Sequence, residues 1–491
     1  MGWLTLLWLA PALGGLLVFA PGKGRAPRWV ALAVAAGVLA YSFWLLVPYS
    51  VGEGGWGLEE AGAPWLFGIQ YHLAADGLSL VLCWLTAFLT VVCVLSSWEK
   101  EVSAAYWSAF LFLEAGVLGV FLARDLLVFY IFWEAVLLPM FFIIGVWGSD
   151  GRRKAAVKFF LFTFFGSLFL LLGILCLVTF HHAATGTWTW DMALLDGNSV
   201  PPSAAIWVLL CLLIGFGVKV PLVPLHTWLP DAHTEAPAAG SVMLAGVLLK
   251  MGLYGIMRLG LGAFSDLTWQ ILPWLAAAAA VNIIYGSICA AVQDDLKRLI
   301  AYSSVAHLGF CVLGVLSRTP EGLAGGTLQM VNHGLTTGAL FLLVGALYEK
   351  GHKRGVGDFG DLVDRAPWLS VCFGVSILAS IGVPGLNGFV GEFMCLAGIT
   401  RVIPVFAVAG AAGIVLSAAY ALPAYQRVFW GEPGPSSVSA KVTDLGTLDK
   451  AVLGLLLALM IWIGLCPGPL LSVIEPAAAA LARAPSLGAA P

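Results

Sequence analysis

Charged residues are scarce in this chain of 491 residues. They make up 10% of the sequence, whereas an ordinary soluble domain carries about 25%. Hydrophobic residues make up 60%, and the mean hydropathy is +0.95. These values exclude a typical soluble protein and place the chain among multi-span membrane proteins. The net charge of −3 gives no indication of a nucleic-acid partner.

No two cysteines have the CxxC spacing. The nine cysteines are scattered through apolar runs, so the sequence indicates neither a disulfide framework nor a zinc or iron–sulfur site. They are expected to be small apolar core residues. The start of the chain also lacks a basic segment ahead of its first apolar run, since Lys23, Arg25 and Arg28 follow that run. This order argues against a cleaved secretory signal, and the run is expected to be the first span.

Long apolar runs dominate the sequence. About fourteen of them have the length of a transmembrane helix, which is roughly 17–25 residues. The sequence therefore predicts an all-α polytopic membrane protein with about fourteen transmembrane helices. The seventh run is interrupted at VPLVP and the twelfth at IGVPGLNG, so helices 7 and 12 are expected to be broken. The expected spans are 3–20, 29–48, 77–97, 105–123, 125–147, 156–180, 204–224, 239–259, 268–291, 298–316, 325–348, 367–402, 404–430 and 451–470.

Basic residues are distributed unevenly between the two sides of this predicted bundle. Counting loops alternately places seventeen lysines and arginines on one side and five on the other. The positive-inside rule makes the richer side cytoplasmic. We therefore expect a multi-pass protein of the bacterial inner (cell) membrane with both termini on the periplasmic side. Only two basic residues, Lys219 and Lys250, are left inside apolar runs.

Six ionisable side chains are expected near the middle of the membrane. A charge there costs about 2.5–3.5 kcal/mol on insertion scales, so such residues usually face a partner or a wet cavity and mark ion paths. Glu134 and His307, for example, lie roughly 14–15 Å into their spans at a rise of about 1.5 Å per residue. The pattern indicates a lateral polar axis through the bundle. The six residues are Glu134, Lys219, Lys250, His307, His333 and Glu392.

Two equal intervals between these residues indicate an internal repeat. Glu134 and Lys219 are 85 residues apart, and so are His307 and Glu392. The second member of each pair lies beside a proline-broken helix. Broken helices in matching positions of two repeats usually point to the transport site of a carrier.

Pro221, Pro224 and Pro384 make the predicted breaks. Proline frees backbone carbonyls, which at membrane depth are tolerated only against protein or water. A lysine beside such a break therefore implies local hydration, as a proton carrier requires. A carboxylate such as Glu134 near Lys219 would bias the protonation of the lysine and act as a switch.

Each of these residues also has a purely structural interpretation. Glu134 and Lys219 can form a static ion pair, although such a pair is weak evidence for stability because desolvation offsets the attraction. His307 and His333 can be hydrogen-bonded core histidines. The segment HTWLPDAHTEAP (226–237) resembles a metal cluster, but its spacing fits no strong zinc pattern. We expect it to be a polar loop near the proton path.

Five long motifs carry a resemblance to a known family. They are FWEAVLLPMFFIIGVWG, KVPLVPLHTWLPDAHTEAPAAGSVMLAGVLLKMGLYG, LKRLIAYSSVAHLGF, QMVNHGLTTGALF and GVPGLNGFVGEF. In this order they resemble the antiporter-like membrane subunits of respiratory complex I, the proton-pumping NADH:quinone oxidoreductase, over about residues 70–430. A glutamate at the position of Glu392 resembles the M type (chain 4 type) rather than the L or N types. One departure is GVGDFGDL (355–362), where the family pattern leads us to expect a glycine at Asp361.

The resemblance implies a proton-translocating subunit of an enzyme complex, with two inverted five-helix repeats and no metal or redox centre of its own. FMN, iron–sulfur clusters and quinone are expected in other subunits, and the L and N chains are expected neighbours in the lipid bilayer. The expected divisions are 1–104 (helices 1–3), 105–260 (first repeat, helices 4–8), 261–430 (second repeat, helices 9–13) and 431–491 (a loop, helix 14 and the tail).

The resemblance also implies roles for single residues. Glu134 and Lys219 would be the family's acid–lysine pair and Lys250 the central relay. His307 and His333 would be bridging histidines, Glu392 would be the exit-side carboxylate, and Glu114 in FLFLEAGVLG would be an acid at the subunit boundary.

Three alternative functions remain open at this point. Related chains build multi-chain Na⁺/H⁺ antiporters and membrane-bound hydrogenases, which copurification of flavin and iron–sulfur subunits would distinguish from complex I. A haem-binding electron-transfer subunit would use His307 and His333 as axial ligands, and an absorption spectrum would reveal the haem. A purely structural subunit would tolerate the neutralisation of Lys250.

Overall fold

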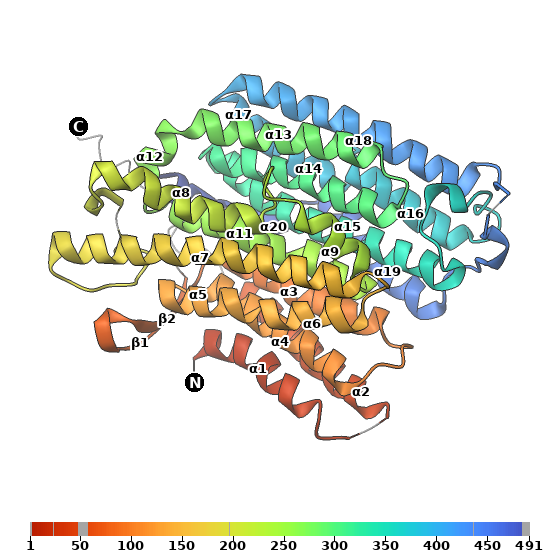
Figure 1. The fold of residues 1–491 in the computed structure, drawn as a ribbon, viewed down its shortest axis with the longest axis horizontal. Coiled ribbons are helices and arrows are strands. Elements are labelled where there is room, and N and C mark those ends of the chain that lie inside the picture. Colours follow the sequence, from red (N-terminus) through yellow and green to blue (C-terminus); the bar gives the residue numbers. More distant parts are fainter. Residues whose placement is uncertain (1, 23, 48–56, 196, 436, 484–491) are drawn as a thin grey trace.

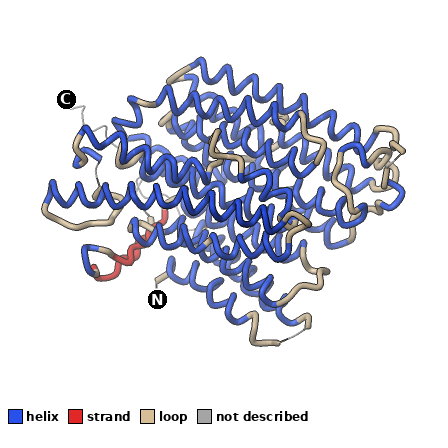
Figure 2. Tube along the Cα trace, viewed as in Figure 1, coloured by secondary structure: helices blue, strands red, loops and turns tan. Residues whose placement is uncertain are grey.

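The computed structural model of the protein describes residues 2–22, 24–47, 57–195, 197–435 and 437–483. Long helices lie side by side and form most of the molecule (Figures 1 and 2). The α-helices are α1 (Trp3–Leu17), α2 (Ala26–Leu46), α3 (Gly77–Ser96), α4 (Ala104–Leu122), α5 (Leu126–Ala135), α6 (Leu137–Trp147), α7 (Arg152–Thr185), α8 (Pro202–Lys219), α9 (Trp228–Glu235), α10 (Ala238–Met243), α11 (Leu249–Gly255), α12 (Ser265–Gln270), α13 (Leu272–Ala291), α14 (Leu296–Leu316), α15 (Pro320–Gly351), α16 (Pro367–Ser380), α17 (Asn387–Thr400), α18 (Pro404–Trp430), α19 (Thr447–Leu465) and α20 (Gly468–Arg483).

Twelve of the described helical segments are long and apolar enough to cross a membrane, and α1 and α16 are shorter apolar helices. The predicted membrane fold is therefore confirmed, while the count of about fourteen spans stays a prediction. The segments α3, α14 and α15 are buried within the bundle, whereas α2, α18 and α19 lie at its periphery. The helix α14 packs against both α13 and α15, and α15 packs against α17. The centre of the bundle is thus built from the helices that hold the histidines.

A short β-hairpin accompanies the helices of this all-α membrane fold. Two strands, β1 (Leu58–Pro64) and β2 (Gln70–Ala75), form an antiparallel hairpin beside the start of α1 (Figure 2). Glu60 on β1 accepts hydrogen bonds from the backbone and hydroxyl of Thr5, so it caps the otherwise unpaired amides at the start of α1. The hairpin marks one end of the bundle, which we call the hairpin end.

Breaks occur inside several predicted spans. As expected, α8 ends at Lys219 and the chain resumes as α9, and α16 and α17 are separated by residues 381–386. The fifth span is also divided, into α5 and α6 at Val136. The eighth contains two π-helical turns, η3 (Leu244–Leu248) and η4 (Ile256–Gly260), on either side of α11. Such turns are often found at functional sites.

The helix α20 was not predicted. It follows α19 after Cys466 and Pro467 and packs against α15 and α3. Its buried residues Leu470, Ile474, Ala477 and Ala478 follow the spacing of one helix face. Glu475, Pro476 and Arg483 interrupt its apolar residues. The sequence therefore shows no continuous apolar run here and predicts only a tail.

The backbone conformation at Asp361 explains why a glycine is expected at this position. Its φ of 52° lies in the left-handed region, where glycine is favoured and aspartate is tolerated. The backbone N–H of Asp361 donates to the carbonyl of Gly431 at 2.8 Å. The departure from the family pattern therefore changes the backbone strain of this turn and leaves its position intact.

A charged cluster attaches the hairpin to the helices. His72 on β2 lies 2.7 Å from Glu59 Oε1 and 3.2 Å from Asp191 Oδ2, and Arg124 donates to the other oxygen of Asp191 at 3.2 Å. The nearby Asp191 carboxylate raises the pKa of His72 above 6.5. Burial alone would raise the pKa of Asp191, but the contacts with His72, the Ala193 amide and Arg124 lower it to about 2.

We predict that this attachment depends on pH. The stabilisation from His72 is complete below pH 6.5 and is lost as the pH rises through its raised pKa. The stabilisation from Asp191 is complete above pH 3.8 and is lost as the pH falls toward about 2. Amide hydrogen exchange of residues 70–75 in the whole protein, corrected for the intrinsic pH dependence of exchange, should be slowest between these limits. His72→Gln should remove the loss of protection at high pH, and protection that ignores pH would contradict the prediction.

Candidate functional site

The two helix breaks place Lys219 and Glu392 inside the bundle. Lys219 is the last residue of α8, and Glu392 lies in the second turn of α17. The second break contains Gly382 with φ of +72°. The backbone conformation favours glycine here, and a Cβ at Gly382 would lie 2.9 Å from Oε2 of Glu392, so a side chain would displace the carboxylate.

Asn282 on α13 holds the first break. Its side-chain carbonyl accepts from the Val223 N–H at 2.7 Å, and its amide donates to the Pro221 carbonyl at 3.1 Å. The side chain is fully buried. These two bonds satisfy backbone groups that the break removes from the helix ladder, as a membrane interior requires.

Lys219 is buried and makes no hydrogen bond among the described residues. Its ammonium lies 5.1 Å from the ring centroid of Trp133, within the range of a cation–π interaction. Glu134, the next residue after Trp133, is half-buried and interacts with Tyr130 and Ser167. Glu134 and Lys219 form no ion pair in the described structure, and the Trp133 ring lies near the ammonium instead. The implied pair is therefore close without being in contact.

Lys250 contacts His333 directly. It lies on α11 between the two π-helical turns and is completely buried. Its Nζ lies 2.8 Å from Nδ1 of His333 on α15 and also donates to the carbonyl of Ala245. A hydrogen bond between two groups that can each gain and lose a proton is the geometry needed for proton transfer.

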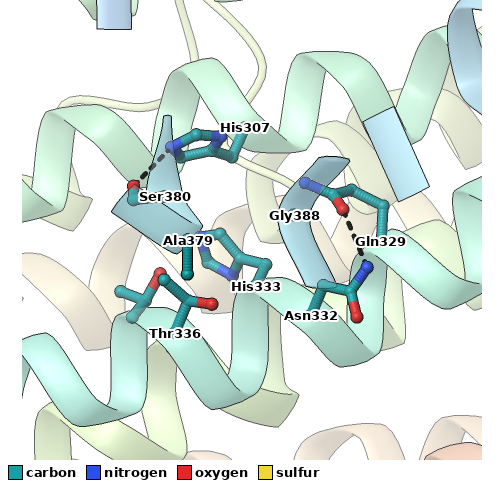
Figure 3. Close-up of a pocket in the computed structure, with 9 residues that line it drawn as sticks. His307, Gln329, Asn332, His333, Thr336, Ala379, Ser380 and Gly388 are labelled. Carbon is teal, nitrogen blue, oxygen red and sulfur yellow. Dashed lines mark hydrogen bonds between the residues drawn. The ribbon is translucent and has the colours of Figure 1, made fainter. Parts of the chain in front are cut away.

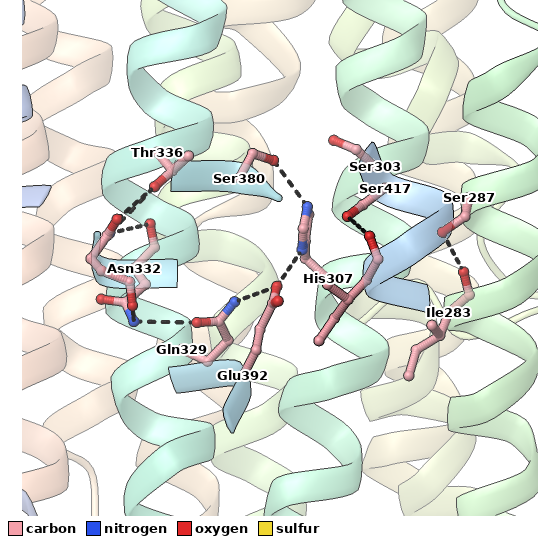
Figure 4. Close-up of polar contacts among 12 residues, drawn as sticks. Ile283, Ser287, Ser303, His307, Gln329, Asn332, Thr336, Ser380, Glu392 and Ser417 are labelled. Carbon is pink, nitrogen blue, oxygen red and sulfur yellow. Dashed lines mark hydrogen bonds and ion pairs between the residues drawn. The ribbon is translucent and has the colours of Figure 1, made fainter. Parts of the chain in front are cut away.

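His307 and Glu392 form the second direct contact. Nδ1 of His307 lies 3.0 Å from Oε1 of Glu392, and its Nε2 lies 3.1 Å from the Ser380 hydroxyl (Figure 4). Gln329 donates to the same carboxylate oxygen at 3.1 Å. Both Glu392 and His307 are buried. The centroids of the His307 and His333 rings are 6.0 Å apart, so the two contacts are neighbours.

A small cavity adjoins both histidines (Figure 3). Its volume is about 10 Å³, which is about the space that one water molecule needs. Nε2 of His333, whose side chain lines the cavity, has no hydrogen-bond partner in the described part of the chain. The lining residues are His307, Gln329, Asn332, His333, Thr336, Thr337, Ala379, Ser380 and Gly388.

Comparison with known proteins assigns this arrangement to a family. Residues 123–417 match the family described as NADH:quinone oxidoreductase/Mrp antiporter, TM. The NADH-quinone oxidoreductase subunit M of Rhodobacter capsulatus is 40% identical over 477 residues, covering 94% of this chain and 92% of that protein. The subunit M of Escherichia coli K12 is 38% identical over 486 residues, covering 96% and 95%. The chain belongs to the subunit M family of complex I.

Solved structures agree with this assignment. A chain of respiratory complex I from Thermus thermophilus superposes with a TM-score of 0.88 at 32% identity, covering 98% of this chain and 99% of that one. A chain of the Mrp complex from Dietzia superposes with a TM-score of 0.86 at 22% identity and shares the fold. The protein is therefore a multi-pass antiporter-like membrane subunit of a multi-chain complex.

The structure groups the predicted site residues of this subunit M homologue unevenly. Lys250, His333, His307 and Glu392 form a series of neighbours, whereas Lys219 and Glu134 lie apart from the series and from direct contact with each other. Glu114 on α4 is completely buried, and neither of its carboxylate oxygens has a hydrogen-bond partner among the described residues. It does not join the series.

The segment 226–237 is not a loop, which corrects the prediction. Residues Trp228–Glu235 form α9, and His233 on this helix is completely buried against Phe341, with ring centroids 4.6 Å apart. Neither ring nitrogen of His233 has a partner in the described structure. Asp231 pairs with Lys158 at 2.6 Å. The loop prediction rests on the histidines and acidic residues of this stretch. Its apolar residues nevertheless allow it to be buried as a helix.

Sequence reasoning missed the neutral amides of the site. Gln329 and Asn332 bond to each other at 3.2 Å (Figure 4), and Asn332 also donates to the carbonyl of Asn387 at 2.7 Å. Asn282 was missed in the same way. The available signal was an amide inside a predicted span, because a buried amide must find partners there.

The site does not fit a haem between the two histidines. Nδ1 of His333 is occupied by Lys250, and both ring nitrogens of His307 are occupied by Glu392 and Ser380. A cavity with room for about one water molecule also cannot hold a porphyrin. The electron-transfer alternative is therefore not supported by the geometry.

We predict that Asn282→Ala destabilises the protein by about 1–3 kcal/mol, because it leaves buried backbone groups without partners. The thermal unfolding midpoint of the purified complex measures the effect. Ser287→Ala is the matched control on α13, since the Ser287 hydroxyl bonds only to the Ile283 carbonyl of its own helix. Equal midpoints for the two variants would show that Asn282 does not hold the break.

Proposed function

We propose that this chain translocates protons as the M subunit of complex I, driven by quinone reduction elsewhere in the complex. The observation that carries the proposal is the 2.8 Å contact between the buried Lys250 and His333. The chain itself would hold no redox centre, and the FMN, iron–sulfur clusters and quinone would belong to other subunits. Neighbouring L and N chains would complete the membrane part.

The proton would move laterally through the series of neighbours. A charged Lys250 donates a hydrogen bond to Nδ1 of His333, and transfer along it leaves a neutral lysine and an imidazolium. His333 would then release the proton on its Nε2 side, where a single water in the cavity can connect it to His307. His307 would pass the proton to Glu392, with which it is already in contact at 3.0 Å. Each transfer along the series neutralises the imidazolium that the preceding transfer created.

Lys219 and Glu134 would control this transfer rather than carry it in the conformation observed. The ammonium of Lys219 is held by the Trp133 ring and has no fixed anion. A shift of Trp133 that brings Glu134 against Lys219 would neutralise this charge. In a low-dielectric interior, that change is felt over several ångströms. The pair would thus act as an electrostatic switch on Lys250, with Glu114 as a further acid toward a neighbouring subunit.

The predicted architecture is part of the same proposal. The equal spacing of the two pairs and the two breaks support inverted repeats over 105–260 and 261–430, preceded by 1–104 and followed by 431–491, of which the last eight residues lie outside the described structure. The bias of basic residues supports an orientation with both termini and the hairpin end on the periplasmic side, and the bacterial relatives support the bacterial inner membrane.

A second candidate function is ion exchange in a multi-chain Na⁺/H⁺ antiporter, which the fold shared with the Mrp complex favours. The two functions differ in the subunits with which the chain assembles. Copurification with flavin and iron–sulfur subunits supports complex I, whereas their absence, together with Na⁺-dependent proton movement, supports the antiporter.

We predict that Lys219→Ala and Glu134→Gln, made separately, slow the coupled complex. A switch that changes the protonation equilibrium of Lys250 by about a factor of ten is worth about 1.4 kcal/mol, so proton translocation and the coupled quinone reduction should fall to about a tenth or less. Both are recorded together in sealed vesicles, after assembly has been verified on native gels. The exposed Lys441 supplies the control Lys441→Ala, which should behave as the unmodified protein.

Wild-type quinone reduction and proton translocation in both assembled variants would contradict the proposed switch. Glu134 and Lys219 would then be structural residues. Loss of quinone reduction together with loss of assembly would be resolved by Lys219→Met, which preserves the apolar stem against the Trp133 ring.

A further inference from the structure

A buried ion pair lies between Lys250 and the hairpin end. Arg258 is two turns beyond Lys250 on the same helical segment, and one of its terminal nitrogens donates to Asp76 Oδ1 at 2.6 Å. The side chains of Arg258 and Asp76 are 8% and 7% exposed. Asp76 also caps α3 by accepting from the Ser79 N–H at 2.9 Å, so the pair joins α3 to the Lys250 helix.

Tyr254 connects this pair to the level of Lys250. It lies four residues from Lys250 and four from Arg258, so the three side chains follow one face of the segment. Its hydroxyl lies 2.9 Å from the Ser79 hydroxyl and donates to the Phe121 carbonyl at 2.9 Å. The guanidinium of Arg258 lies 4.9 Å from the Tyr254 ring and 3.3 Å from the Ser79 hydroxyl.

Without Arg258, a water molecule in its place would complete a proton wire. A terminal nitrogen of Arg258 donates both to Asp76 Oδ1 at 2.6 Å and to the Ser79 hydroxyl at 3.3 Å, so a water at that position can join the carboxylate to the hydroxyl. The Ser79 hydroxyl already lies 2.9 Å from the Tyr254 hydroxyl, one helical turn from Lys250. Arg258 lies among them. A guanidinium stays protonated in proteins and has no acceptor atom, so it cannot pass a proton on.

We propose that Arg258, held by Asp76, is a barrier that stops Lys250 from exchanging protons with the hairpin end. Lys250 then exchanges its proton laterally with His333. The inference rests on the proposed function and adds a residue that gives the transfer its direction. A fixed positive charge in a buried site repels protons electrostatically, and Asp76 compensates for the cost of burying that charge.

The test uses Arg258→Gln in the whole complex in sealed vesicles. Removal of the barrier should reduce the number of protons translocated per quinone by roughly twofold or more, and should speed the passive decay of an imposed pH gradient by a similar factor. Quinone reduction should persist. Arg258→Lys keeps the charge and should preserve the wild-type ratio. Arg124→Gln breaks another ion pair near the hairpin, 3.2 Å long, and should not create a leak.

Two further variants keep the test decisive. In Arg258→Gln combined with Lys250→Ala, the leak should disappear, because protons entering from the hairpin end have to pass Lys250. Arg258→His retains a cation only at low pH, so it should leak more as the pH rises above about 6.5. It replaces Arg258→Gln if the latter does not assemble.

The barrier is refuted if assembled Arg258→Gln, or Arg258→His at high pH, keeps both the wild-type ratio and the wild-type decay. It is also refuted if the leak of Arg258→Gln persists without Lys250. Failure of the proposed function can be distinguished from failure of the Arg258 barrier. A leak that depends on Lys250 in Arg258→Gln, together with normal translocation in Lys219→Ala, supports the barrier and removes only the switch.

Discussion

The contact between Lys250 and His333 is the interaction on which the rest of the structure depends. A lysine at the centre of an apolar bundle is costly unless its charge is stabilised by a partner. His333 and the Ala245 carbonyl supply these partners, and they require α15 to lie against the π-helical turn before α11. The central position of α15 and the irregular backbone around Lys250 follow from the same requirement.

Backbone groups at the two helix breaks are satisfied by side chains from neighbouring helices. Asn282 holds the break after Lys219, and Asn332 donates to the Asn387 carbonyl at the start of α17. Because these contacts fix the broken segments, the ionisable residues beside the breaks are held at defined distances. Lys219 is held differently, because its ammonium lies against an aromatic ring and has no hydrogen-bond partner among the described residues. That difference is the basis of the switching role that we propose for Lys219.

Much of the fold could be predicted from the sequence because length and hydropathy determine where helices cross a membrane. The breaks followed from proline, and the burial of Lys250, His307 and Glu392 followed from their depth in apolar runs. The hairpin and α20 could not be found because their residues form no membrane-length apolar run. Which ionisable residues touch depends on the packing of distant helices, so sequence spacing could not show that Lys219 lies near the Trp133 ring without an ion pair to Glu134.

A double-mutant cycle on Lys250 and His333 tests the central claim most directly. Lys250→Ala, His333→Leu and the double variant are compared in protons translocated per quinone reduced, in assembled complexes. If the two residues act in series, the double variant should lose no more than the more severe single variant. Losses in the two single variants that add in the double variant would contradict the account, because each residue would then act on a separate path.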